Sequence, residues 1–378
     1  MFHRQQLLKG IYDNLLPEHQ AKVLTNKQVT AIENLENSVR VSTADGSTYE
    51  GDMVIGADGV HSSVRTMMAF PAGSRSLEDA AHPFKATYRV LFGSAPKSPL
   101  VSTSEVYESH GTDLSAQFFI GNDRMWFFIY EKLAKQTNQK QSYTAADADV
   151  YAESHGDMHV APGLVFRDLY ATRYGSGLTN LEEGILPQWS AERVALVGDA
   201  AHKVTPNIGW GYNSGVMDLV ALVNPLRKAL VASHGTSLNT ASLEKIFATY
   251  QDDRMAFMTK VFNLSARVTR MSAWATWFGR VLDGYIFPLV KADELLSTYS
   301  LGPLISSVPV LYWLDEENLG QGRIPWKRGP EKDLEEVVST KSEKELNSAA
   351  FLPVALTATA ALASWTLASH GLPSWLVL

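Results

Sequence analysis

The sequence predicts an α/β (α+β) fold, and three features of its 378 residues indicate this. Two short apolar runs, residues 53–57 and 193–197, each lead into a turn that carries an aspartate, as buried strands of a parallel sheet do. Residues 83–130 hold several aromatic-rich runs, which are typical of strands in a second sheet. From residue 215 onward, apolar residues recur at helical spacing.

The composition excludes several classes of protein. Hydrophobic residues make up 45% and charged residues 19%, so the chain is neither disordered nor fibrous. Lys and Arg number 33 against 40 Asp and Glu, and the net charge of −7 disfavours binding to nucleic acid. The absence of cysteine excludes disulfides, cysteine-ligated metal sites and a thiol nucleophile. No spacing of His, Asp or Glu predicts a metal site either.

The first part of the chain predicts a helix, a strand and a hairpin. Apolar residues fall on one helical face across residues 2–16. Residues 23–32 predict a strand. The runs 38–43 and 48–51 flank an Asp-Gly dipeptide, which is typical of a β-hairpin turn.

The middle of the chain predicts a sheet and one helix. Residues 84–92, 101–107 and 115–130 are expected to be strands, with a hairpin turn at 121–123. The aromatic side chains of these strands either line a cavity or pack a core. Residues 145–155 predict a short helix.

The last part of the chain is helical and apolar. Residues 215–230 and most of 242–290 predict helices. Within the second, the aromatic stretch 274–278 belongs either to a core or on a membrane surface. Residues 349–378 contain no Asp, Glu, Lys or Arg. We expect a membrane span or inserted hairpin there, with 349–372 as the candidate transmembrane segment, or alternatively a buried helix.

Two stretches carry residues suited to chemistry. In residues 52–65 a buried strand ends in a turn with Asp58, at the strand end where open α/β sheets place ligands, although ordinary strand–helix connectivity has the same pattern. In residues 195–215 a buried strand delivers Asp199, and a glycine-rich loop then opens a helix. Such a helix N-terminus suits an electron-rich group, and Asp199 is placed to accept hydrogen bonds from a ribityl or ribose hydroxyl.

In this order, the two stretches resemble the DG and GD motifs of class A flavoprotein monooxygenases. Arg4 resembles the arginine that opens an early helix of the same family. The chain looks most similar to the fungal membrane-associated epoxidases of indole-diterpene and meroterpenoid pathways, and the resemblance covers most of residues 1–314.

The resemblance implies an FAD-dependent enzyme that uses NAD(P)H and O2. It implies insertion of one oxygen atom into a hydrophobic substrate, by epoxidation of a prenyl double bond on a terpenoid. Aromatic hydroxylation by the same flavin chemistry is an alternative. A membrane location follows from the same resemblance, at the endoplasmic reticulum with the catalytic part in the cytosol.

The resemblance also implies an arrangement of domains. An FAD-binding domain would comprise residues 1–80 and 176–235, and a substrate-binding β-sheet domain residues 81–175. Residues 236–330 would form a helical C-terminal region, followed by the apolar segment.

Site residues carry over from the resemblance position by position. Asp199 would contact the ribityl region of FAD, and the backbone N–H of Tyr212 would lie near the flavin ring. Asp58 would help to hold the pyrophosphate side, and Arg4 would contact the cofactor. Arg89 matches the catalytic arginine of this branch, where a guanidinium stabilises negative charge on oxygen, although an ordinary ion-paired strand arginine fits the sequence as well.

One signature of the family does not occur among these residues. The 378 residues hold no Gly-x-Gly-x-x-Gly string, the turn that binds the ADP half of FAD. The fold we predict is therefore an incomplete Rossmann-like FAD-binding domain with a β-sheet substrate domain and a C-terminal helical or membrane segment. We accordingly expect weak FAD binding, and a non-catalytic, membrane-tethered remnant is the remaining alternative.

Overall fold

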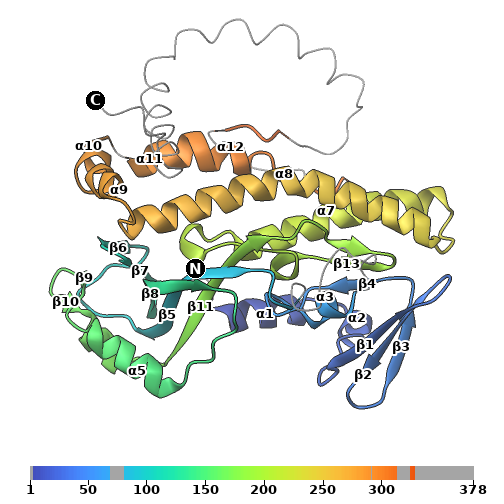
Figure 1. The fold of residues 1–378 in the computed structure, drawn as a ribbon, viewed down its shortest axis with the longest axis horizontal. Coiled ribbons are helices and arrows are strands. Elements are labelled where there is room, and N and C mark those ends of the chain that lie inside the picture. The colour runs from blue at the N-terminus through green and yellow to red at the C-terminus, as the bar shows by residue number, and fades with distance from the viewer. Residues whose placement is uncertain (1–2, 69–80, 291, 313–323, 328–378) are drawn as a thin grey trace, which may run out of the picture. The chain divides into compact units, whose positions relative to one another are not determined.

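The computed structural model describes residues 3–68, 81–290, 292–312 and 324–327 (Figure 1). The chain divides into two compact units, Met1–Ala273 and Trp274–Leu378. The helical region that we expected at 236–330 is therefore divided, because residues 236–273 belong to the first unit and the rest to the second.

A six-stranded antiparallel sheet is the largest element of the first unit, and it confirms the predicted strands at 84–92 and 115–130. The strand expected at 101–107 is largely wrong, because residues 101–105 form turns and the strand there spans Val106–Gly111. The turn at 121–123 joins two strands of the sheet, as expected. One strand, Gly175–Ile185, pairs with Lys85–Pro96, so the sheet extends past the boundary expected at residue 175. In sheet order the strands are β14 (His202–Lys203), β11 (Gly175–Ile185), β5 (Lys85–Pro96), β8 (Arg124–Thr137), β7 (Leu114–Ile120) and β6 (Val106–Gly111).

The two faces of this sheet bury different side chains, because successive residues of a strand point to opposite sides. Leu91 and Phe127 pack on the face covered by α5 (Ala145–Ser154) and α6 (Phe166–Ala171). On the other face, Tyr88, Val90 and Tyr130 pack with Ala273, which follows the long helix α8 (Thr240–Ser272). The predicted helix at 145–155 is confirmed as α5.

A three-stranded sheet carries the two motif strands. In it β13 (Val194–Leu196) lies between β12 (Ser190–Ala191) and β4 (Val54–Gly56). The β13–β4 pair is parallel, with Leu196 opposite Gly56, as predicted. β13 is fully buried, but β4 is not, because Ile55 is exposed.

The N-terminal elements differ in part from their prediction. The hairpin β2 (Val39–Thr43) and β3 (Thr48–Gly51) is confirmed, but its partner β1 spans Val29–Asn34, later than expected. The helix α1 (Arg4–Asp13) buries no residue, and Ile11 on its apolar face is exposed. The remaining short elements here are α2 (Pro17–Gln20), α3 (Ser63–Met67), β9 (His159–Ala161) and β10 (Leu164–Val165).

Two helices complete the first unit. α7 (Gly211–Ala232) and α8 (Thr240–Ser272) pack against each other (Figure 1). α7 begins earlier than predicted, so Tyr212 lies in its first turn rather than in a loop. The single-turn 3₁₀ helices η1 (Gly198–Ala200) and η2 (Pro206–Ile208) precede it.

The second unit is a chain of short helices. The helix predicted to run to residue 290 is interrupted after α8, where Trp274 takes a left-handed conformation with φ 44°. Two of the following segments are π-helical. The helical segments of the second unit are, in chain order, α9 (Trp277–Val281), η3 (Leu282–Ile286), α10 (Phe287–Val290), α11 (Ala292–Leu296), η4 (Ser297–Leu301) and α12 (Gly302–Ile305).

The predicted membrane segment has no counterpart among the described residues. The stretch 349–372 lies outside them. Within the described ranges, the helices are all too short or too polar to cross a bilayer.

A substitution at Gly56 tests how tightly β4 packs against β13 and α3. A Cβ at this position would lie 2.7 Å from Val64 Cγ1 and 2.8 Å from Leu196 Cδ2. We expect G56A to lower the free energy of unfolding by about 1–3 kcal/mol, because the core there has no room. Urea denaturation measures the change. The matched control is G51A, at a site with open space, and an equal loss in both variants would contradict the packing argument.

Candidate active site

The two motif loops leave the same edge of the three-stranded sheet. Because β4 and β13 are parallel, their carboxyl ends lie side by side, and Val197 N donates to Gly56 O at 3.0 Å. Asp58 follows the first strand and Asp199 the second. The sequence predicted that these ends would meet, and the strand pairing brings their loops together.

Asp58 caps the helix that follows it. One carboxylate oxygen accepts a hydrogen bond from the Ser62 hydroxyl, and the other accepts one from Val64 N at 3.0 Å. Ser62 Oγ in turn accepts from Arg65 N at 2.9 Å. The structure thus shows Asp58 ordering its own loop, while contact with a pyrophosphate stays a prediction.

Arg65 joins the two loops, a role that sequence reasoning missed. Its guanidinium is fully buried and donates to Val60 O at 2.8 Å and to Ala200 O at 2.9 Å. These carbonyls belong to the first and second motif loops respectively. Little in the sequence signals this role, because Arg65 stands in a mixed polar and apolar helix turn, Ser63–Met67.

A buried charge cluster holds the second loop. The Asp218 carboxylate, on α7, accepts from Gly198 N at 2.8 Å and from Arg254 Nε at 2.7 Å, and lies 2.7 Å from His202 Nε2. These three side chains are at most 2% exposed. The cluster therefore ties the start of the loop (Gly198), its middle (His202) and α8 (Arg254) to one carboxylate.

The charge of Asp218 follows from its surroundings. Burial alone would raise its pKa, but the attraction and hydrogen bonds of His202 and Arg254 outweigh burial, so the pKa is lower than usual. The carboxylate is thus ionised at neutral pH. A nearby tyrosine, Tyr250, has its pKa raised well above the usual value by burial and donates to Leu196 O at 3.0 Å.

Asp199 lies beside the start of α7. Its carboxylate forms an ion pair with Lys203, and it lies about 4.0 Å from where a Cβ on Gly211 would stand. Tyr212 follows Gly211 in the first turn of the helix, where backbone N–H groups have no intrahelical acceptor. The structure thereby brings Asp199 and the Tyr212 backbone to the same end of α7.

Arg4 and Arg89 are placed differently. Arg4 lies at the exposed start of α1. Arg89 pairs with Glu131 at 2.6 Å, with its guanidinium 4.8 Å from the Tyr151 ring of α5. Arg89 thus has the ion-pair partner that the alternative interpretation required. Its catalytic role stays a prediction.

The N-terminal end of α7, together with the loop before it, fits the flavin half of FAD. Asp199 supplies a carboxylate acceptor for hydroxyl groups, and the first turn of the helix supplies N–H donors and a positive dipole end. A Cβ on Gly209 would meet nothing within 4 Å, so a flat ring has room to approach the backbone there. Acceptor, donors and open glycine backbone are the set that a ribityl chain and a flavin ring require.

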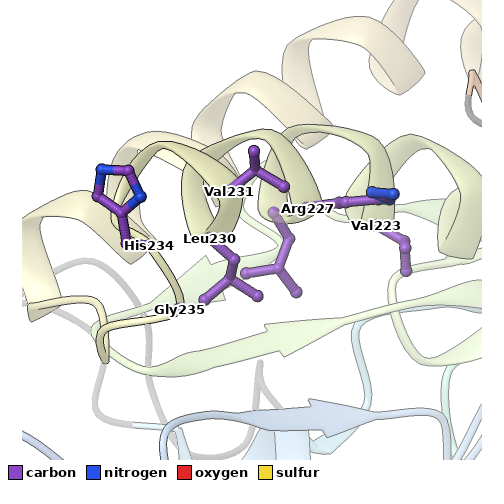
Figure 2. Close-up of a pocket in the computed structure, with 7 residues that line it drawn as sticks. Val223, Arg227, Leu230, Val231, His234 and Gly235 are labelled. Atoms are coloured by element: carbon purple, nitrogen blue, oxygen red, sulfur yellow. The ribbon is translucent and has the colours of Figure 1, made fainter.

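A shallow hollow of about 510 Å³ lies elsewhere on the same helix (Figure 2). It is lined by residues of the C-terminal half of α7 and the turn after it, including Val223, Leu230 and His234. Val223 is roughly 18 Å along the helix from Gly211. The hollow therefore does not belong to the Asp199 site.

A family model for the FAD binding domain matches residues 4–265. The chain belongs to this family. Among its relatives, FAD-dependent monooxygenase spyC of Aspergillus fumigatus is 34% identical over 294 residues, which cover 75% of this chain and 62% of spyC. FAD-dependent monooxygenase ausM of Emericella nidulans is 34% identical over 308 residues, which cover 78% of this chain and 63% of ausM. The chain thus spans less than two thirds of either relative.

Solved structures agree on the fold. A salicylate hydroxylase in complex with its substrate superposes with a TM-score of 0.57 at 20% identity, covering 82% of this chain and 76% of that protein. Klebsiella pneumoniae HpxO in complex with FAD and uric acid superposes with a TM-score of 0.56 at 21% identity, covering 80% of this chain and 69% of HpxO. The expected mixed α/β FAD-binding monooxygenase fold is confirmed, and FAD is the cofactor this family implies.

Asp218 offers a test of the buried cluster. We expect D218N to lower the free energy of unfolding at pH 7 by about 3 kcal/mol or more, because the buried guanidinium of Arg254 loses its counter-charge. The folded-state pKa of Asp218 is depressed, so its contribution is present above the ordinary carboxyl pKa and is lost as the pH falls through the folded value.

Urea denaturation at a series of pH values measures both effects. The parent should lose stability in acid more steeply than D218N does. As a control, D13N removes an exposed carboxylate of α1 and should leave the unfolding midpoint essentially unchanged. Parallel pH profiles in parent and D218N would show that the cluster is not ionised as described.

Proposed function

We propose that this protein is an FAD- and NAD(P)H-dependent monooxygenase that inserts one oxygen atom from O2 into a hydrophobic substrate. The observation that carries the proposal is the site at the start of α7, where Asp199 and the helix N-terminus lie on a loop held by Asp218 and Arg65. Membership of the FAD-binding family and the FAD-dependent monooxygenase relatives support it.

The residues of this chain would position the cofactor. Asp199 would accept hydrogen bonds from the ribityl hydroxyls, with its carboxylate oriented by Lys203. The first turn of α7 would donate N–H groups to the flavin ring at Tyr212. Bound FAD would supply the redox chemistry: NAD(P)H gives two electrons, one oxygen atom enters the substrate and the other leaves as water.

For the substrate, we propose a prenylated terpenoid whose double bond is epoxidised, in fungal secondary metabolism. The face of the six-stranded sheet that carries Val90, Phe128 and Leu181 is apolar at these three positions, and this supports a binding region of low polarity beside it. An apolar wall of this kind suits a prenyl chain and excludes water from the reacting atoms.

Oxygen labelling tests the proposed reaction. The full chain is incubated with FAD, NADPH, ¹⁸O2 and a panel of farnesylated and geranylgeranylated phenols. We expect products that carry one ¹⁸O atom on the prenyl chain, detected by mass spectrometry. A label on the aromatic ring would instead identify an aromatic hydroxylase, and a chain that retains no flavin would favour the non-catalytic alternative.

Two variants in the same assay separate the roles of Arg89. E131Q removes the ion-pair partner and keeps the guanidinium, whereas R89Q removes the guanidinium. If Arg89 stabilises charge during catalysis, only R89Q lowers kcat. If the pair is structural, both variants lower stability alike and leave kcat equal.

We further propose that the second unit docks on a bilayer surface at the endoplasmic reticulum, with the catalytic part on the cytosolic side. Four large apolar residues spaced four apart are exposed along α9, η3 and α10: Trp277 (79%), Val281 (40%), Tyr285 (70%) and Leu289 (81%). The core interpretation of 274–278 therefore fails for Trp277. The wider π turn between these helices keeps such a spacing close to one line.

The chemistry of this stripe supports lipid as its partner. Trp and Tyr are enriched where bilayers meet water, and a helix lying there buries one apolar side. Arg280 stacks on Trp274, whose indole N–H donates to Asp283 at 2.7 Å, so neighbouring charges are engaged within the unit. In the sequence, the uncharged residues 349–378 would add a second lipid contact.

Vesicle sedimentation tests the stripe. The parent should co-sediment with neutral phosphatidylcholine vesicles, and W277S/L289S should bind at least about tenfold more weakly, because two large apolar side chains no longer enter the lipid. V150S, at an exposed apolar residue of α5, serves as the control and should bind like the parent. Equal binding by parent and double variant would refute docking through this stripe.

A further inference from the structure

Gln117 connects the six-stranded sheet to the loop that carries the candidate cofactor site. It lies on β7 and is 8% exposed. Its side-chain nitrogen donates to Asn207 O at 3.2 Å and to Glu108 Oε1 at 2.6 Å, and its side-chain oxygen accepts from Tyr130 OH at 3.0 Å. These bonds fix the orientation of the amide, because a flipped amide would point its oxygen at two acceptors.

The partner of Gln117 is a turn held from its other side by α8. Asn207 is the middle residue of η2, and its Oδ1 accepts from the Thr269 hydroxyl at 2.7 Å. The preceding Thr205 hydroxyl lies 2.6 Å from Ser265 Oγ, also on α8. Thr205, Ser265 and Thr269 are all buried.

This turn leads directly into the candidate site. Gly209 follows η2 in the left-handed conformation, with φ 69°, and α7 begins at Gly211. Any displacement of Asn207 therefore moves the glycine backbone and the first turn of α7. The backbone carbonyl that Gln117 binds lies only four residues before Gly211.

A buried amide in this place needs a reason beyond packing. Phe128 lies opposite Gln117 on the next strand, whereas all three hydrogen-bond partners of the amide are polar groups, from Glu108, Tyr130 and Asn207. A leucine would fill the space but would leave these partners without the amide. Among the described residues of β7, Gln117 is the one whose side chain binds the turn before α7.

We propose that Gln117 is a positioning residue for the cofactor loop. From the substrate sheet, it fixes the place of the turn 205–209 and so of the N-terminus of α7. That this loop binds a cofactor rests on the proposed function, whereas the positioning of the loop by Gln117 does not depend on it. Tyr130 holds the amide in the donating orientation, and Thr269 holds the same turn from α8.

Hydrogen–deuterium exchange on the full chain tests the proposal without any activity. We expect Q117L to remain folded and to exchange the backbone amides of residues 207–213 at least about tenfold faster than the parent, while β7 and β8 keep their protection. E108Q is the matched control, because it alters the other acceptor of Gln117 and leaves the bond to Asn207. Unchanged exchange at 207–213 in Q117L would overturn the proposal.

FAD titration adds a second readout. Quenching of flavin fluorescence should give a dissociation constant at least about tenfold higher for Q117L than for parent and E108Q, with an altered absorbance spectrum of the bound flavin. If no variant, parent included, binds FAD, the proposed function fails while the exchange result still decides the role of Gln117.

A second variant guards against misfolding. If Q117L does not fold, Y130F removes the hydroxyl that orients the amide, and a smaller acceleration confined to 207–213 is expected. Parental exchange in Y130F would then count against the proposal. Faster exchange throughout β7 and β8 would show a purely structural role and would count against it too.

Discussion

The carboxylate of Asp218 lies where three parts of the first unit meet, and it is the only acceptor that Gly198 N, His202 and Arg254 are seen to share in the described structure. A buried carboxylate is costly unless it is paired, and here two side chains and one backbone N–H compensate it. Because Asp218 belongs to α7, Arg254 to α8 and Gly198 to the loop after β13, this one interaction fixes how the candidate site is assembled.

The rest of the site is attached to that cluster by backbone contacts. Arg65 binds Ala200 O, so the first motif loop follows the second. Tyr250 donates to Leu196 O and ties α8 to the end of β13. Gln117 of β7 and Thr269 of α8 both donate hydrogen bonds to Asn207, in the turn just before α7. The glycine-rich loop is thus held at its start, at its middle and just before α7.

The large sheet separates two kinds of environment. On the α5 face aromatic rings pack closely, and the ring centroids of Phe127 and Phe166 are 5.3 Å apart. Arg89 pairs with Glu131 on the same face. On the other face, a polar contact from Gln117 reaches the loop beside α7. Adjacent residues such as Tyr88 and Arg89 therefore have different roles for a simple geometric reason: they point to opposite sides of one strand.

Local patterns in the sequence determined much of this fold. Apolar runs, turn dipeptides and helical spacing are properties of neighbouring residues, so the hairpin β2–β3, the parallel strands β4 and β13 and the helix α5 could be predicted. The two motifs also led to the candidate site at Asp199. Boundaries such as the start of α7 were missed, because propensities near Gly209 and Gly211 disfavour a helix that tertiary contacts nevertheless stabilise.

Only the tertiary structure decided which distant groups meet. The pairing of Arg65 with Ala200 O, of Asp218 with Arg254 and of Gln117 with Asn207 depends on helix packing and strand register, which no local pattern encodes. The same is true of the face on which Arg89 lies and of the capping role of Asp58. A side chain's chemistry can be read along the chain, but its partner is set by the packing that brings remote segments together.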